Sequence, residues 1–256
     1  MHRFFVMPNQ VNLTSGEIVI HDEDVKHISK VLRLKEKDIV EICDGESKEY
    51  ICSIASIHKN EVVLSIEEER KSTQEASVEV VLYQGVPKGA KMDLIIQKTT
   101  ELGIKEIIPV MMERTVVQFD SPKDEVKKVE RWQKIAEEAA KQSKRGMIPK
   151  IHLPMSFKDA IEDSRKNALN IMPYENEENR GFKNIIKNLS KEDQASIKKI
   201  GVWIGPEGGF EESEVVKAIE NGIHPVTLGP RILRTETAGF TMLSLVMYEL
   251  GDLGGA

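Results

Sequence analysis

The chain has 256 residues, which is enough for one large domain or two modest ones with cores that need no disulfide or metal. Hydrophobic residues make up 40% and charged residues 30%, and no apolar run approaches the roughly 18 residues of a membrane helix, so fibrous, disordered and membrane-spanning proteins are excluded. The formal net charge of −6 excludes a uniformly basic nucleic-acid-binding surface, and any RNA contact is expected from local patches.

The first seventy residues predict a small β-rich unit. Short strands are expected at 2–6 and 16–20, then a helix at 21–34, and then strands at 38–45, 48–59 and 61–69. Several short strands joined by tight turns favour a small barrel. The polar stretch at 68–77 indicates a linker, which divides the chain into domains at 1–72 and 73–256.

The rest of the chain alternates strand-like and helix-like segments. Apolar strands are expected at 78–86, 105–110, 149–153, 168–172, 199–205 and 224–229. Helices are expected between and after them at 89–102, 123–145, 156–163, 181–189, 211–221 and 237–250. This alternation predicts an α/β domain with a mainly parallel sheet.

Two glycine-rich loops directly follow strands of this domain. They are Ile-Gly-Pro-Glu-Gly-Gly-Phe at 204–210 and Leu-Gly-Pro-Arg-Ile-Leu-Arg-Thr-Glu-Thr-Ala at 228–238. Ligands of open α/β sheets bind beyond the carboxyl ends of the strands, where glycine lets the backbone approach a bound molecule. The loops therefore predict a binding site, and two tight turns without a ligand are the alternative.

The ligand of this site is not expected to be a polyphosphate. The chain has neither the Gly-Lys-Ser/Thr ending of a P-loop nor the glycine pattern of a dinucleotide fold. The helix after the first loop begins with Glu211, Glu212 and Glu214, whose carboxylates repel phosphate from the helix N-terminus. A neutral or cationic ligand with a nucleoside part fits better, and S-adenosylmethionine is such a ligand.

The two loops, followed by an apolar last helix, resemble those of the SPOUT methyltransferases. The chain more closely resembles the ribosomal RNA small subunit methyltransferase E family, also in Met-His-Arg-Phe-Phe-Val at 1–6 and in the segments 87–104 and 131–145. The resemblance spans essentially the whole chain.

This resemblance implies a fold and an activity. It implies a PUA-like, RNA-binding β-barrel at 1–72 and a SPOUT methyltransferase domain at 73–256 whose C-terminal part forms a deep trefoil knot. It implies methyl transfer from S-adenosylmethionine to N3 of a specific uridine in the 16S ribosomal RNA of the small subunit. It further implies a homodimer with the active site near the subunit interface. A cytoplasmic location is expected separately, because residues 1–10 lack the longer apolar core and small-residue cleavage site of a signal peptide.

The same resemblance assigns the cofactor to the two loops and the strand ends beside them. Leu228, Ile232 and Leu233 are expected to contact the adenine or ribose, with ordinary core packing as the alternative. The full set of expected cofactor-binding residues is Met172, Pro173, Ile204, Gly205, Pro206, Gly208, Gly209, Leu228, Gly229, Arg231, Ile232, Leu233, Thr237 and Ala238.

Arg234 and Glu236 are the expected catalytic residues. Methylation of N3 requires loss of the imide proton, so Glu236 or Glu207 is a candidate base, although the sequence does not identify one. Arg234 is expected either to stabilise the uracil anion or to contact RNA phosphate. A structural ion pair of Arg231 or Arg234 with Glu236 is the alternative.

The expected RNA contacts are basic residues in local patches. Residues 123–145 hold 8 Lys and Arg against 5 Asp and Glu, although a solvated charged helix is an equal alternative. Lys98 and Glu101 share a helix face and form either a surface ion pair or part of the RNA cleft. The expected RNA-binding residues are Arg3, Lys88, Lys98, Arg114, Arg131 and Arg145.

Three further expectations concern partners and rival functions. The helix at 237–250 is apolar on nearly every side, which favours a subunit interface over complete burial in a monomer. Cys43, Cys52 and six scattered histidines show no ligand spacing, so no metal is expected. The rivals are a SPOUT methyltransferase acting on another RNA and a non-catalytic RNA- or ribosome-binding protein.

Overall fold

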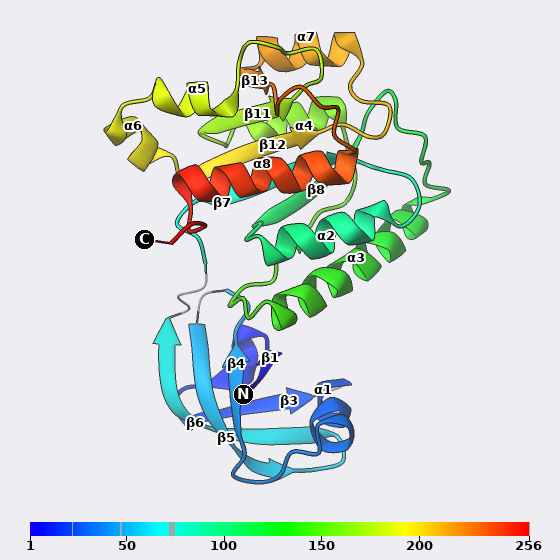
Figure 1. Ribbon diagram of the computed structural model, residues 1–256. Coiled ribbons are helices and arrows are strands. Elements are labelled where there is room, and N and C mark those ends of the chain that lie inside the picture. Colours follow the sequence, from blue (N-terminus) through cyan, green and yellow to red (C-terminus); the bar gives the residue numbers. More distant parts are fainter. Residues whose placement is uncertain (22, 47, 72–74, 256) are drawn as a thin grey trace. The chain divides into compact units, whose positions relative to one another are not determined.

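The computed structural model describes residues 1–21, 23–46, 48–71 and 75–255 (Figure 1). It divides the chain into two compact units, Met1–Glu75 with Ala140–Ile148 and Ala76–Ala139 with Pro149–Ala256. The boundary expected between residues 72 and 73 lies outside the described residues, as does Asp22 in the first expected helix. The chain thus returns to its first unit after beginning the second, which the sequence does not predict.

The first unit is built on a six-stranded sheet in the order β1-β4-β5-β6-β3-β2. Its strands are β1 (His2–Phe5), β2 (Val11–Asn12), β3 (Glu17–His21), β4 (Ile39–Cys43), β5 (Lys48–Ile57) and β6 (Glu61–Lys71). Strand β1 pairs with β4 in parallel, whereas the other neighbours are antiparallel. Alternate apolar residues of these strands, among them Phe4, Ile18 and Ile42, meet in one buried core.

The helix expected at 21–34 is shorter and less regular in the structure. It consists of α1 (Glu23–Lys26) and a π-helical turn, η2 (His27–Val31), which the N–H of Leu32 closes by donating to the carbonyl of His27. Arg33 has a φ of +53°, in the left-handed region that ends a right-handed helix. A short 3₁₀ turn, η1 (Pro8–Gln10), and strand β2 were not predicted.

Residues 140–148 are fixed to the first unit by polar contacts. The guanidinium of Arg3 donates to the backbone carbonyl of Arg145 at 2.8 Å, and the guanidinium of Arg145 forms an ion pair with Glu75. Lys141 pairs with Asp24. These contacts close the unit around a segment that is distant in sequence.

The second unit is an α/β domain with a parallel sheet, which confirms the predicted fold class. The strand order is β10-β8-β7-β12-β11-β13, and β9 also pairs with β8. The strands are β7 (Glu79–Gly85), β8 (Glu106–Met111), β9 (Lys150–Ile151), β10 (Met155–Ser156), β11 (Leu169–Pro173), β12 (Lys199–Ile204) and β13 (Ile223–Val226). All the pairings are parallel, so the carboxyl ends of the central strands meet at one edge.

Helices cover both faces of this sheet (Figure 1). They are α2 (Lys91–Glu101), α3 (Pro122–Gln142), α4 (Phe157–Ser164), α5 (Phe182–Lys187), α6 (Lys191–Ser196), α7 (Glu212–Glu220) and α8 (Thr235–Leu250). On one face, Tyr83 stacks on Trp203 with ring centroids 4.4 Å apart, within a core that α4 and α7 complete. On the other face α8 packs against β12 and α2. The sequence predicted these helices except for α6.

Candidate functional site

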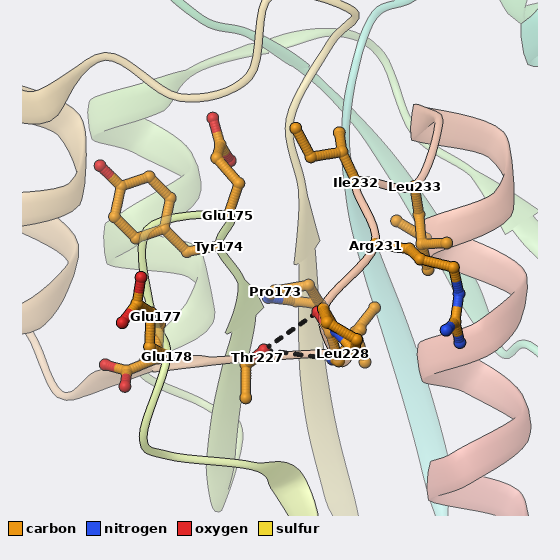
Figure 2. A pocket seen from close by; sticks show the side chains of 13 residues that line it. Pro173, Tyr174, Glu175, Glu177, Glu178, Thr227, Leu228, Arg231, Ile232 and Leu233 are labelled. Atoms are coloured by element: carbon orange, nitrogen blue, oxygen red, sulfur yellow. Dashed lines mark hydrogen bonds between the residues drawn. The ribbon is translucent and has the colours of Figure 1, made fainter.

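Two cavities share a wall at the carboxyl edge of the parallel sheet. The first has a volume of about 560 Å³ and lies between the segment after β11 and the loop after β13 (Figure 2). The second has a volume of about 410 Å³ and lies between the loop after β12 and the start of α8. The residues that line both are Pro173, Glu175, Ile232, Leu233 and Ala238.

The first cavity has one wall from each of two segments. Figure 2 shows Tyr174, Glu175, Glu177 and Glu178 on one side and Leu228, Arg231, Ile232 and Leu233 on the other. Gly229 has a φ of +103°, and its N–H donates to Thr227 Oγ1 at 3.1 Å. The loop therefore turns at a position that requires glycine. Pro173, Thr227, Gly229, Pro230 and Ala238 complete the lining.

The loop after β12 is a tight turn with no room for a side chain at its glycine positions 205 and 209. A Cβ atom on Gly205 would lie 3.0 Å from the carbonyl carbon of Gly209, and Gly209 has a φ of +70°. The N–H of Gly209 donates to the carbonyl of Pro206 and closes the turn. The second cavity is lined by Lys91, Pro173, Glu175, Ile204, Gly205, Pro206, Glu207, Gly208, Gly209, Phe210, Ile232, Leu233, Arg234, Thr235 and Ala238.

A buried hydroxyl group joins the two loops to the sheet. Thr235 is the first residue of α8 and is 6% exposed, and its Oγ1 donates to the carbonyl of Gly205 at 2.6 Å. The same Oγ1 accepts a hydrogen bond from Nε2 of Gln84, at 2.9 Å, and Gln84 also donates to the carbonyl of Gly85. Sequence reasoning placed Thr235 in a turn before the helix and did not single out Gln84.

Charged groups at the rim of the second cavity are paired. Glu207 accepts a 2.8 Å hydrogen bond from Lys91 Nζ and a 3.0 Å bond from the N–H of Lys88. Burial alone would raise the pKa of Glu207, but these hydrogen bonds outweigh it and leave the pKa below its usual value. Glu207 is thus a weak base at neutral pH.

The α7 N-terminus is occupied by its own carboxylates. Glu211 and Glu214 form a capping box, in which each side chain accepts from the other residue's backbone N–H. Glu214 also accepts from the N–H of Glu113. The backbone N–H groups of Glu211 and Glu214 are therefore already engaged by carboxylates of the helix itself.

The two expected catalytic residues have different environments. Arg234 lines the second cavity, and the described part of the chain offers its exposed guanidinium no ion-pair partner. Glu236 is half-buried in the first turn of α8, and its Oε2 is buried without a hydrogen-bond partner among the described residues. Glu236 lines neither cavity, and the alternative ion pairs with Arg231 or Arg234 are not formed between these described residues.

Most of the expected cofactor-binding residues meet at these cavities. Two of them, Met172 and Thr237, line neither cavity, because Met172 is fully buried in the core and Thr237 is exposed on α8. Lys91 and Phe210, the last residue of the first glycine-rich loop, line the second cavity. Tyr174, Glu175 and Thr227 also belong to the lining and were not singled out from the sequence. The position of Tyr174, Glu175 and Thr227 directly after the ends of β11 and β13 is the sequence feature that could have identified them.

The structure corrects two of the expected RNA contacts. Arg3 pairs with Glu41 and Glu49 and its side chain is 7% exposed, while Arg145 pairs with Glu75 and is 4% exposed. These guanidinium groups neutralise buried carboxylates and cannot reach a phosphate in this conformation.

The other expected RNA contacts lie nearer the surface. Lys98 pairs with Glu101 at 2.8 Å, as the ion-pair alternative expected. Arg131 forms a bidentate ion pair with Asp93, and Arg114 donates hydrogen bonds to Glu211 and to the carbonyl of Gly208. Lys88 is exposed. Exposed ion pairs of this kind contribute little to stability, so these cations remain available for exchange onto phosphate.

The described residues contain neither a candidate metal site nor a candidate membrane-spanning helix. Residues 1–21, 23–46, 48–71 and 75–255 contain no group of three or more His, Cys, Asp or Glu side chains that could hold a metal ion. No helix in these same ranges is long and apolar enough to cross a membrane.

Comparison with known proteins gives consistent matches for both units. The RNA methyltransferase domain family matches residues 74–247, and the RNA methyltransferase PUA domain family matches residues 20–67. The ribosomal RNA small subunit methyltransferase E of Bacillus subtilis is 35% identical over 260 residues, covering 100% of this chain and 99% of the relative. The enzyme of the same name from Aquifex aeolicus is 34% identical over 96% of this chain and 99% of its own.

A solved structure matches the whole chain. It is the ribosomal RNA small subunit methyltransferase E of Neisseria gonorrhoeae bound to S-adenosyl methionine, with a TM-score of 0.84 and 29% sequence identity over 99% of both chains. The fold of this chain is therefore similar to that of the Neisseria enzyme.

Proposed function

The chain belongs to the ribosomal RNA small subunit methyltransferase E family, and on that premise we propose that it transfers a methyl group from S-adenosylmethionine to N3 of a uridine in 16S ribosomal RNA. The family matches support the reaction class and the kind of RNA. One observation in the structure carries the proposal: each glycine-rich loop lines one of two adjoining cavities, and the wall between them comes from the segment after β11 and the loop after β13. One cavity accommodates a nucleoside cofactor and the other accommodates a target base.

The residues present fit S-adenosylmethionine. Glycine backbone at 205 and 229 offers close approach to a ribose, while Leu228, Leu233 and Pro173 offer apolar walls for an adenine ring. The carboxylates that cap the N-terminus of α7 repel a phosphate, but they do not repel a nucleoside with a cationic sulfur. S-adenosylmethionine supplies a methyl group on a sulfonium, which is electrophilic without acid catalysis.

The protein must bring a deprotonated N3 in line with that methyl group. A uridine presents N3 only when its Watson–Crick edge is free, so the base has to leave any pair or stack before it enters the cavity. Arg234 at the second cavity stabilises the negative charge that the uracil gains when its imide proton leaves. Alignment of the two reacting atoms lowers the barrier by several kcal/mol more. The pKa of Glu207 lies below its usual value because of the hydrogen bonds from Lys91 and the N–H of Lys88, which makes Glu207 a weak base for the imide proton.

The outer side of α8 supports a homodimer. A groove of about 510 Å³ there is lined by Phe240, Thr241, Ser244, Leu245, Tyr248 and Leu253. Tyr248 is 66% exposed on a helix whose other side is buried in the core, and an exposed apolar strip of this kind favours association. We infer that two copies associate through α8 in the cytoplasm and that the C-terminal part forms the trefoil knot of the family. Tyr248→Glu should then convert a dimer to a monomer in sedimentation equilibrium, and an unchanged mass would contradict the interface.

Methyl transfer to isolated ribosomal subunits tests the activity. Radiolabelled S-adenosylmethionine is supplied with small subunits from a strain that lacks this gene, and reverse transcription then locates the product, since a methyl group on N3 blocks pairing and stops the polymerase. We expect incorporation by the wild type and at least a hundredfold slower incorporation by Arg234→Ala.

Gly229→Val supplies a second variant with a matched control. Gly222 also has a positive φ, +78°, and open space around its Cβ position, but lies outside both cavities. Gly222→Val should therefore lose stability through the same backbone strain while it retains methyl transfer. No incorporation by wild type into subunits or their naked RNA would contradict the proposed reaction.

A further inference from the structure

Glu175 lies where the two cavities meet. It follows β11 by two residues and contributes to the lining of both cavities. In Figure 2 its side chain points toward the end of the cavity where Ile232 lies, whereas Glu177 and Glu178 lie toward the other end. Glu175 therefore stands at the border between the expected places of the methyl donor and the acceptor base.

The Glu175 carboxylate lies directly against the loop after β12. A Cβ atom on Gly209 would be 2.8 Å from Glu175 Oε1, so glycine at this position makes room for the carboxylate. This contact is a second reason, besides a φ of +70°, for glycine at 209. The loop thereby fixes the carboxylate at the shared wall.

The charge of Glu175 is not neutralised by a direct partner. Its carboxylate forms no ion pair or hydrogen bond with any residue in the described ranges. The nearby cation is Arg114, but Arg114 donates to Glu211 through Nε and to the carbonyl of Gly208 through Nη1. Glu177, in contrast, accepts two backbone N–H groups of its own turn. Glu175 is thus an available negative charge at the border of the cavities.

We propose that Glu175 recognises the positive charge of the methyl donor and makes the site prefer S-adenosylmethionine to the demethylated product. This inference rests on the proposed function. The donor carries a sulfonium, and methyl transfer converts that sulfonium to a neutral thioether without changing the adenosine or amino-acid parts. A carboxylate near the sulfur attracts the first form and not the second. The product therefore binds more weakly than the donor that replaces it.

Substitution of Glu175 by glutamine separates this role from general binding. The two ligands are S-adenosylmethionine and S-adenosylhomocysteine, each titrated calorimetrically into the full-length protein. We expect Glu175→Gln to weaken binding of the first about tenfold and of the second less than twofold. Glu175→Asp, which retains the charge, should recover most of the difference. Glu212→Gln removes an exposed carboxylate that lines neither cavity and should leave the ratio of the two affinities unchanged.

Two outcomes would overturn the assignment. Equal weakening of both ligands by Glu175→Gln would mean that the carboxylate binds the shared amino group or supports the fold, and unchanged binding of both would mean that it touches neither. Failure of the proposed function is seen in the wild type, which would then either bind neither ligand or bind them without methylating the ribosomal subunits.

Discussion

Replacing Thr235 with valine removes one hydroxyl group and nearly preserves the shape of the side chain. In the native structure this hydroxyl accepts from Gln84 Nε2 and donates to the carbonyl of Gly205, and both partners are buried. Each buried polar group left without a partner costs about 1–3 kcal/mol, and the added methyl returns about 0.8 kcal/mol. The free energy of unfolding of Thr235→Val should therefore fall by about 1–5 kcal/mol.

The same change should loosen the cofactor site, since Thr235 connects the loop after β12 to α8. Affinity for S-adenosylmethionine, measured by calorimetry, should fall about tenfold, while urea denaturation reports stability. Thr235→Ser is the control because it keeps the hydroxyl and loses only a methyl group, at a cost of about 1 kcal/mol. The reasoning is refuted if valine is as stable as threonine, or if serine loses as much stability and affinity as valine.

Three further predictions concern groups outside the cavities. Arg145→Ala leaves the Glu75 carboxylate unpaired and should cost about 3–5 kcal/mol in urea denaturation, whereas Arg165→Ala, which breaks an exposed pair with Glu162, should cost less than about 1 kcal/mol. A hydrogen bond from His152, with a further contribution from Lys199, holds the pKa of Glu106 far below its usual range. The resulting stability is present above the unfolded pKa of about 4.3 and is lost as pH falls through the folded value, so Glu106→Gln should flatten the acid side of the stability curve. Burial raises the pKa of Cys43 and Cys52 to about 12, so iodoacetamide at neutral pH should label both only in denaturant.

Each of these three has an outcome that contradicts it. Equal costs for Arg145→Ala and Arg165→Ala would mean that burial of the pair has no energetic effect. An acid limb of Glu106→Gln as steep as that of the wild type would assign acid unfolding to other carboxylates. Rapid labelling of either cysteine in the native protein would show that the first unit opens readily.

Local patterns in the sequence were sufficient for the parallel sheet and the binding loops. The runs at 78–86 and 199–205 are apolar over strand length, and they form β7 and β12 side by side. Glycine clusters directly after strands identified both cavity walls because a tight turn must follow each strand end. These features depend on residues close together in the chain.

The rest depends on contacts between residues far apart in sequence. Nothing near Gln84 indicates that its amide meets Thr235, which lies 151 residues later. Arg145 ends a basic segment and was expected on the surface. It is instead buried in an ion pair with Glu75, which lies 70 residues earlier in the chain. Glu175 became visible as a site residue only when the fold placed its carboxylate over Gly209. Spacing alone contains no information about such pairs.

The return of residues 140–148 to the first unit has a consequence for synthesis on the ribosome. The first 75 residues cannot complete their unit when they emerge, because Arg145 and its carbonyl are still missing. At about 5–20 residues per second, translation from residue 75 to residue 148 takes roughly 4–15 s. During this interval Arg3 lacks the carbonyl of Arg145 and Glu75 lacks the guanidinium of Arg145, while strands β7 and β8 are already being made. The first unit of this chain can therefore complete its fold only after residue 148 has been made, and a fragment ending at residue 75 would lack part of that unit.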